Sequence, residues 1–201
     1  MANKDRPFGF VPWGEVLRAR YYKVATAPVI HLCVGDMVQA DNTGGTSLIG
    51  LIHIVKDDAV ITDAAGATFK LLGAVLACFD EKMDPLQYID VGRVGDGSIA
   101  GYLLVADHPD QQFVAQGDAA FSAADIDLQY DIHPVALNAP DTNTGLSTQE
   151  IGIAGAAVTT TIPIRLYGQS HPDEDVITAA GCRMICQINP DLHQFGTFVT
   201  V

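Results

Sequence analysis

The sequence predicts a mainly β fold with little helix: a single β-barrel or β-sandwich domain preceded by an extended N-terminal arm. Short apolar or β-branched runs recur along the chain, and residues that favour turns separate them. Few segments carry helix signals, and none has the length and periodicity of a core helix. The first 23 residues differ from the rest, because they concentrate aromatic, proline and basic residues.

Apolar runs predict the strands that follow the arm, and turn chemistry marks their ends. Glycine and asparagine supply positive φ in separators such as Gly35-Asp36, and proline supplies a fixed φ in His108-Pro109-Asp110. The predicted strands are residues 29–34, 47–55, 59–62, 71–79, 101–106, 112–115, 161–167, 182–188 and 196–201.

Helix signals are confined to two short stretches. Ser122 is a candidate N-cap with Asp125 three residues later, which predicts a turn or two of helix within residues 119–128. Pro85 stands at a possible first helical position, so residues 84–89 are predicted to start another. Residues 152–161 are simple in composition and predict a mobile loop or an edge strand.

The arm is predicted to span residues 1–23, and the β-rich domain residues 24–201. Pro7 and Pro12 each fix φ and lack an N–H donor, and a glycine follows each of them within two residues. The arm is therefore expected to be extended or turning around these prolines.

Three aromatic side chains of the arm need a surface on which to pack. Burying Phe8, Phe10 or Trp13 is worth roughly 1.5–3 kcal/mol each. The arm either packs back on its own domain or lies on a neighbouring protein, and we predict the second. The residues predicted to dock on a partner are Arg6, Pro7, Phe8, Phe10, Trp13, Arg18 and Arg20.

Charge separates the arm from the rest of the chain. Five basic residues against two acidic ones make residues 1–23 formally +3, whereas residues 24–201 carry six bases against 22 acids, or −16. The net charge of −13 argues against a nucleic-acid partner, because phosphate contacts need a basic face. The sequence therefore predicts no nucleic-acid binding.

The apolar content predicts subunit contacts rather than membrane insertion. Hydrophobic residues make up 48% of the chain and charged residues only 17%, which we interpret as a surplus that covers an oligomer interface. The longest apolar run, residues 71–79, is too short to span a bilayer, and the start lacks the layout of a signal peptide. We expect synthesis in the cytoplasm and no membrane partner.

The cysteines and the acidic turns are predicted to have structural roles rather than to bind metal. Cysteines occur without a CxxC pair, and we predict that all four are buried free thiols: Cys33, Cys78, Cys182 and Cys186. The acidic clusters at residues 107–110 and 173–175 resemble calcium loops only in charge, because neither has EF-hand spacing. We interpret them as solvated turns, and we expect no metal and no cofactor.

The sequence contains no recognisable catalytic motif, and we predict a protein that is not an enzyme and has no small-molecule substrate. The six histidines are scattered singly, and neither a nucleophile elbow nor a P-loop occurs. A small hydrolase stays open as an alternative, since a histidine can meet a serine or cysteine in space.

Several segments, in their order along the chain, resemble the capsid decoration proteins of tailed bacteriophages, also called cement proteins. The segments that carry the resemblance are the start MANKDRPFGFVP, residues 30–38, GYLLVADHPDQQFVAQ at 101–116, residues 123–128, 143–147 and 163–166, and CRMICQINPDLH at 182–193.

This resemblance implies a structural virion protein with a jelly-roll, tulip-like or other barrel fold. It implies binding outside a shell of major capsid protein, as a homotrimer that holds neighbouring capsomers together. The arm would then reach over capsid subunits, with Arg6, Arg18 and Arg20 against acidic capsid surface. A virion domain that binds host glycans or a tail component remains an alternative, for which Tyr130 or Tyr167 beside acidic loops would be the feature.

Overall fold

The computed structural model describes residue 3 and residues 6–25, 28, 31–40, 51–53, 71–95, 99–134, 142–157 and 162–195. Strands dominate these residues, and their helical content is limited to two single-turn 3-10 helices, η1 (Ala123–Asp125) and η2 (Pro190–Leu192). The prediction of a mainly β chain is confirmed, and nearly all strand pairs are antiparallel.

The first six-stranded sheet is antiparallel throughout. In spatial order it consists of β1 (Val11–Pro12), β10 (Gln112–Gln116), β14 (Arg183–Ile188), β13 (Ile164–Gln169), β11 (Gln129–Pro134) and β12 (Gln149–Ala157). The strand β12 lies at one edge, which confirms the edge-strand alternative for the described part of residues 152–161.

The second six-stranded sheet contains the longest apolar strands. Its order is β4 (Met37–Ala40), β5 (Leu51–His53), β2 (Ala19–Ala25), β9 (Ile99–Ala106), β6 (Leu71–Phe79) and β7 (Pro85–Leu86). The strands β2 and β5 are parallel, and β4 also pairs with β6. A small separate sheet joins β3 (Leu32–Cys33) to β8 (Tyr88–Ile89).

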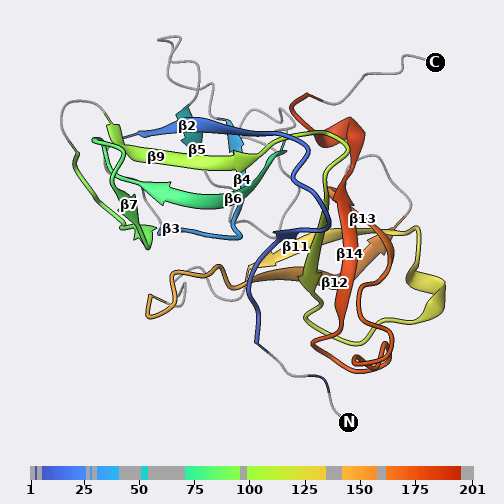
Figure 1. Cartoon of the computed structure of the whole chain (residues 1–201). Helices are drawn as coiled ribbons and strands as arrows, with labels where there is room; N and C mark the ends of the chain where they lie inside the picture. Colours follow the sequence, from blue (N-terminus) through green and yellow to red (C-terminus); the bar gives the residue numbers. More distant parts are fainter. Residues whose placement is uncertain are drawn as a thin grey trace.

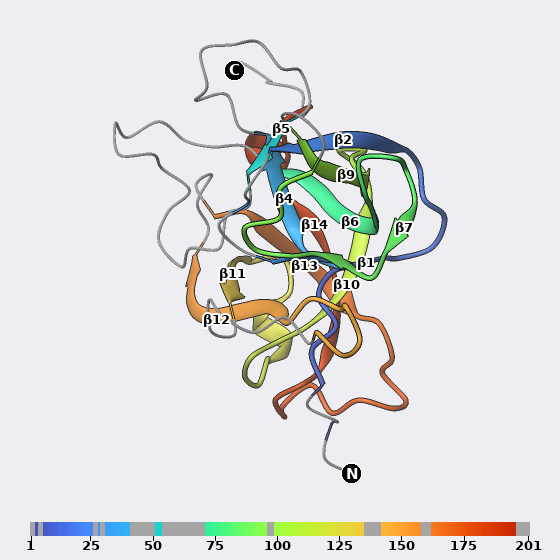
Figure 2. The ribbon, with the colours of Figure 1, turned by 90° about the vertical axis from the view of Figure 1, so that its left-hand side faces the viewer.

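The two large sheets lie next to each other with their strands crossing. Figure 1 shows β9 and β6 running across the direction of β14, and Figure 2 shows the second sheet above the strands β11 and β12 of the first. One hydrophobic cluster joins the first sheet to Met37, Leu71, Ala74 and Ala106 of the second sheet, and the other lies on the opposite side of the second sheet.

The strand β6 belongs to both clusters, because both of its faces are buried and register shifts interrupt the alternation of its side chains. Leu71 and Ala74 pack in the cluster of the first sheet, whereas Leu72 and Val75 pack in that of the second. This double burial explains why residues 71–79 form a continuous apolar run.

The local predictions had mixed outcomes. The capping box of Ser122 and Asp125 is confirmed at η1. The helix start predicted at residues 84–89 is wrong, because β7 and β8 occupy that stretch and pair with β6 and β3. The strands predicted at residues 59–62 and 196–201 lie outside the described residues.

The division into an arm of residues 1–23 and a domain of residues 24–201 is corrected by the pairing of β2. This strand begins at Ala19 and pairs with β9 along its whole length, so a boundary after Lys23 cuts a central strand of the second sheet. Residues before it are also tied to the body, since β1 pairs with β10. We call residues 6–18 the leader below.

The leader fits against the body through a contact that only glycine permits. Gly9 has φ +74°, and a Cβ atom built there would lie 2.5 Å from the carbonyl oxygen of Gly35 and 2.5 Å from Cβ of Ser147. The N–H of the next residue, Phe10, donates to the same Gly35 oxygen at 2.8 Å. The leader backbone therefore touches the body backbone directly.

Gly9→Ala should destabilise the protein more than Gly14→Ala, although both glycines have φ +74°. The positive φ costs each alanine variant about 1–2 kcal/mol. Only the first variant also overlaps neighbouring atoms, which adds roughly 1–3 kcal/mol. Urea unfolding of the two variants measures the difference. Equal midpoints would show that the leader does not pack tightly on Gly35.

Candidate docking surface

The leader is hydrogen-bonded to its own body at intervals. The bonds are Arg6 N–H to Gln116 Oε1 (3.1 Å), Trp13 N–H to the Gln112 carbonyl (2.8 Å) and Leu17 N–H to Gln111 Oε1 (2.9 Å). The leader therefore lies on the same chain rather than extending away from it.

The predicted docking residues divide into an inner and an outer group. Phe10 is fully buried in the hydrophobic cluster of the first sheet, so its prediction as a partner anchor is wrong. The reason is that its own core offers the apolar surface that it needs. Pro7 and Phe8 are half-buried, and Arg6 is exposed.

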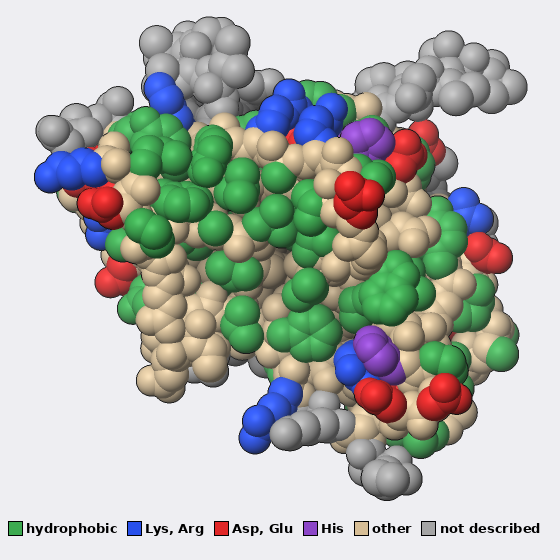
Figure 3. All heavy atoms as spheres, viewed as in Figure 1, with side chains coloured by type: hydrophobic (Ala, Val, Ile, Leu, Met, Phe, Trp, Pro, Cys, Tyr) green, Lys and Arg blue, Asp and Glu red, His purple; other side chains and the backbone are tan. Residues whose placement is uncertain are grey.

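The outer side of the leader and the start of β2 present apolar side chains to solvent. Their exposed fractions run from 39% for Trp13 to 52% for Leu17 and 55% for Tyr21. We call these residues the outer band: Val11, Trp13, Val16, Leu17 and Tyr21. In the orientation of Figure 1, Figure 3 shows hydrophobic side chains gathered over the face that carries β2 and β9.

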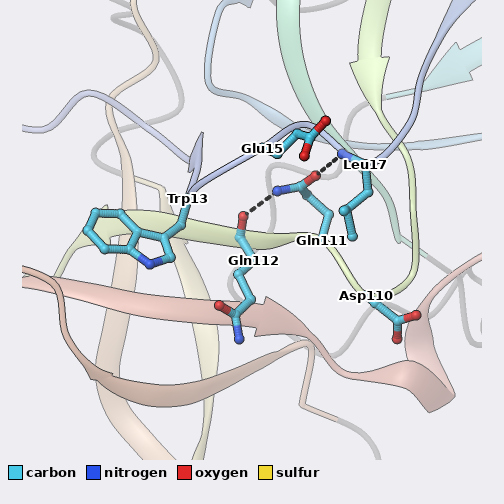
Figure 4. A pocket seen from close by; sticks show the side chains of 6 residues that line it. All are labelled: Trp13, Glu15, Leu17, Asp110, Gln111 and Gln112. Atoms are coloured by element: carbon cyan, nitrogen blue, oxygen red, sulfur yellow. Dashed lines mark hydrogen bonds between the residues drawn. The ribbon is translucent and has the colours of Figure 1, made fainter.

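A shallow hollow of about 190 Å³ opens beside the outer band. Figure 4 shows Trp13 at one end and Asp110 at the other, with Leu17 and the two glutamines between them. Gln111 is buried, and its amide accepts from Leu17 N–H and donates to the Gln112 carbonyl at 2.8 Å. Its side chain thus fixes the distance between the leader and β10.

Arg18 and Arg20 are both held by one buried carboxylate. Asp107 is completely buried, and it receives Arg18 Nε at 2.7 Å and Arg20 Nε at 2.5 Å. Arg18 also donates to the Asp107 carbonyl at 2.7 Å, and the Tyr22 hydroxyl donates to the carboxylate. The arginine side chains are 36% and 45% exposed, so each presents an outer part to solvent.

The charge state of this cluster follows from its hydrogen bonds. Burial alone would raise the pKa of Asp107, but the bonds from Tyr22, Arg18 and Arg20 outweigh it and hold this pKa below its usual value. Burial, together with the hydrogen bond to Asp107, raises the pKa of Tyr22. Asp107 is therefore ionised and Tyr22 is neutral at ordinary pH.

His193 and Phe195 complete the cluster from the C-terminal side. The Phe195 ring centroid lies 4.5 Å from the Arg20 guanidinium carbon and 5.1 Å from that of Arg18, so the ring contacts both cations. His193 is fully buried and its Nδ1 accepts from Phe195 N–H at 3.0 Å. Burial lowers the pKa of His193 to about 4.

The interpretation of the acidic clusters as solvated turns is wrong for two residues. Asp107 is the buried centre just described, and Asp175, whose side chain is only 8% exposed, binds Arg183 Nε at 2.7 Å. Both are structural counter-ions. Glu174 binds Nη2 of the same arginine, but its side chain is 67% exposed and so remains solvated. Among the described residues, no group of His, Cys, Asp and Glu side chains has the arrangement of a metal site.

The remaining reactive groups have structural partners. All four cysteines are buried and free, as predicted, and burial raises the pKa of Cys78 to about 12 and of Cys182 to about 11. Ser170 Oγ lies 2.8 Å from Nδ1 of His171. The same hydroxyl donates a hydrogen bond to the Arg183 carbonyl at 3.1 Å. Ser170 and His171 are sequence neighbours, and the bond to the Arg183 carbonyl gives the Ser170 hydroxyl a structural role.

The aromatic residues named for glycan binding differ in position. Tyr130 is fully buried against Phe121, so it cannot contact a sugar in this structure. Tyr167 is partly exposed, but its hydroxyl donates to Gln187 at 2.7 Å.

Comparison with known proteins identified no relative of this chain. No family model, no curated protein and no solved structure matches the chain. Within the part of the chain that the structure describes, no helix has the length and hydropathy to cross a bilayer.

The sequence reasoning found some surface residues and missed others. Trp13, Arg18 and Arg20 were selected, whereas Leu17 and Tyr21 were missed. The signal that would have found Tyr21 is the aromatic and β-branched content of residues 21–24, which is typical of a strand with one exposed face.

Asp107→Asn should destabilise the protein by about 2–4 kcal/mol, because it removes the charge that holds two arginines and a tyrosine hydroxyl. The partial exposure of both arginines keeps the loss below that of a fully buried pair. Urea unfolding at neutral pH measures the change. Asp110→Asn, three residues later and exposed, is the control, and a similar loss in both variants would contradict the role of Asp107.

Stability should fall as the pH drops from about 6.5 to about 4, because His193 takes up a proton in the unfolded chain over this range but not in the folded one. The loss by pH 4 should reach about 3 kcal/mol, at about 1.4 kcal/mol for each unit of pKa difference. The negative charge of Asp107 raises the pKa of His193, whereas the charges of Arg18 and His108 lower this pKa.

Urea midpoints measured across this pH range test the prediction. The His193→Gln variant should show a flatter profile between pH 6.5 and 4 than the wild type. Parallel profiles for wild type and His193→Gln would contradict the assignment.

Proposed function

We propose that the chain is a structural virion protein that binds the outer surface of a phage capsid and stabilises contacts between capsomers of the major capsid protein. The observation that carries the proposal is the outer band, a row of large apolar side chains on one continuous segment. Such a row loses free energy in water and gains it against a protein surface. The resemblance to decoration proteins indicates that this protein surface belongs to the major capsid protein.

The composition of the outer band suits an interface between proteins. Trp, Tyr and Arg are the residue types that most often dominate binding energy, and Trp13, Tyr21 and Arg20 provide one of each. The leader is already ordered on its own body, so binding need not order a loose segment. The proposal therefore depends on an ordered surface of the leader and β2 rather than on a free arm.

We also propose that the chain acts as a homotrimer, and we propose a more specific fold class for its two sheets. Three copies of the outer band on one particle would bind together, so that modest affinity at each site suffices. We propose a sandwich-like arrangement for the two crossed sheets, of jelly-roll or tulip-like type, which leaves the leader on an outer surface (Figure 1). The chain would reside on the capsid exterior after synthesis in the host cytoplasm.

Deletion of residues 1–14 is a poor test, because it removes Phe10 from the core together with the hydrogen bonds of the leader. Substitution of exposed side chains in the outer band avoids this problem. Leu17→Ser and Tyr21→Ser change side chains that are about half-exposed, so the fold should survive.

The double variant Leu17→Ser/Tyr21→Ser should bind expanded shells of the major capsid protein about thirtyfold more weakly at each site. Covering each exposed half side chain contributes roughly 1 kcal/mol, which for two residues gives this factor. Co-sedimentation of purified protein with shells measures the bound fraction, and unfolding midpoints confirm that the variants fold.

Val94→Ser is the matched control, because Val94 is also exposed and apolar but lies outside the outer band. It should bind shells like the wild type. The proposal is wrong if the wild type does not decorate shells. The role of the outer band is wrong if the double variant binds as well as the control.

A further inference from the structure

We propose that Arg18 and Arg20 form a two-pronged site for carboxylate groups on the surface of a partner protein. This inference rests on the proposed function and deepens it, since it names the chemistry that the partner presents beside the outer band. Both guanidinium groups are held through Nε, and Arg18 Nη2 also donates to the Asp107 carbonyl. This leaves Nη1 of Arg18 and the Nη atoms of Arg20 for an outside acceptor.

The site carries an uncompensated positive charge. Asp107 neutralises only one of the two arginines, and among the described residues no second carboxylate pairs with either. The chain as a whole has a net charge of −13, so this positive site is opposite in sign to its surroundings.

The two guanidinium groups are held in position before a partner arrives. Each is fixed at Nε by the buried carboxylate, and each contacts the Phe195 ring within 5.1 Å. Ordering a flexible arginine side chain is a large part of the cost of an exposed ion pair. Because the body of this chain has already ordered both side chains, a carboxylate that binds them avoids that cost.

A protein carboxylate fits this place better than a polyphosphate. The Phe195 ring is partly exposed and contacts both guanidinium groups, so an occupant meets apolar surface and positive charge together. A protein surface offers apolar side chains and isolated carboxylates in that combination. A nucleic acid would bring a row of phosphates close to an acidic body.

Fluorescence anisotropy of a labelled hexaglutamate peptide tests the site without any shell. The peptide should bind the full-length protein at low salt and dissociate as the salt concentration rises. Arg20→Gln should weaken binding about fivefold, the size expected for one exposed ion pair. Arg20→Lys should weaken it less, because it keeps the charge but loses the fork of donors.

Arg165→Gln is the matched control, because Arg165 is an exposed arginine of the first sheet paired with Asp127. It should bind the peptide like the wild type. If Arg20→Gln fails to fold, Arg20→Lys decides, since it retains a cation beside Asp107. Equal peptide affinity for wild type and Arg20→Lys in that case overturns the proposal.

A second probe separates carboxylates from phosphates. A labelled single-stranded hexanucleotide should bind more weakly than hexaglutamate, and equal or stronger binding of the nucleotide overturns the choice of partner. Absence of peptide binding overturns the site even if shells are decorated. Peptide binding that depends on Arg20 supports the site even if shells are not decorated, so the failure of the proposed function is distinguishable.

Discussion

The buried carboxylate of Asp107 is the interaction on which the placement of the leader depends. It follows β9 directly and receives hydrogen bonds from three residues at the junction of the leader and β2. A buried charge without such partners would be strongly unfavourable. The need to satisfy this one carboxylate therefore fixes the direction in which the chain enters the second sheet.

The strand β6 gives the fold its second constraint, since it is buried on both faces and shares its side chains between the two cores. The backbone of the leader reaches the same region, because Gly35, which accepts from Phe10, donates its own N–H to the Val75 carbonyl. The outer band thus lies on a segment that is connected to the centre of the molecule through a short series of backbone hydrogen bonds. Its position is a property of the fold.

The sequence predicted the mainly β fold and the buried thiols, because apolar runs and turn residues are local signals. It also identified Trp13, Arg18 and Arg20 as surface residues with unusual composition. It could not predict that Phe10 lies in the core, because the choice between its own domain and a neighbour depends on contacts with residues far along the chain. The burial of Asp107 was missed for the same reason: its partners are more than eighty residues away in sequence.

The leader and the start of β2 carry inward-facing and outward-facing residues on one continuous backbone. Gly9 and Phe10 face inward and determine where the segment lies, whereas the side chains of Leu17 and Tyr21 face outward and contribute little to that position. Mutations at the outward residues can therefore accumulate without loss of folding. A chain built in this way can change its recognition specificity over evolution, or by engineering, while its architecture stays constant.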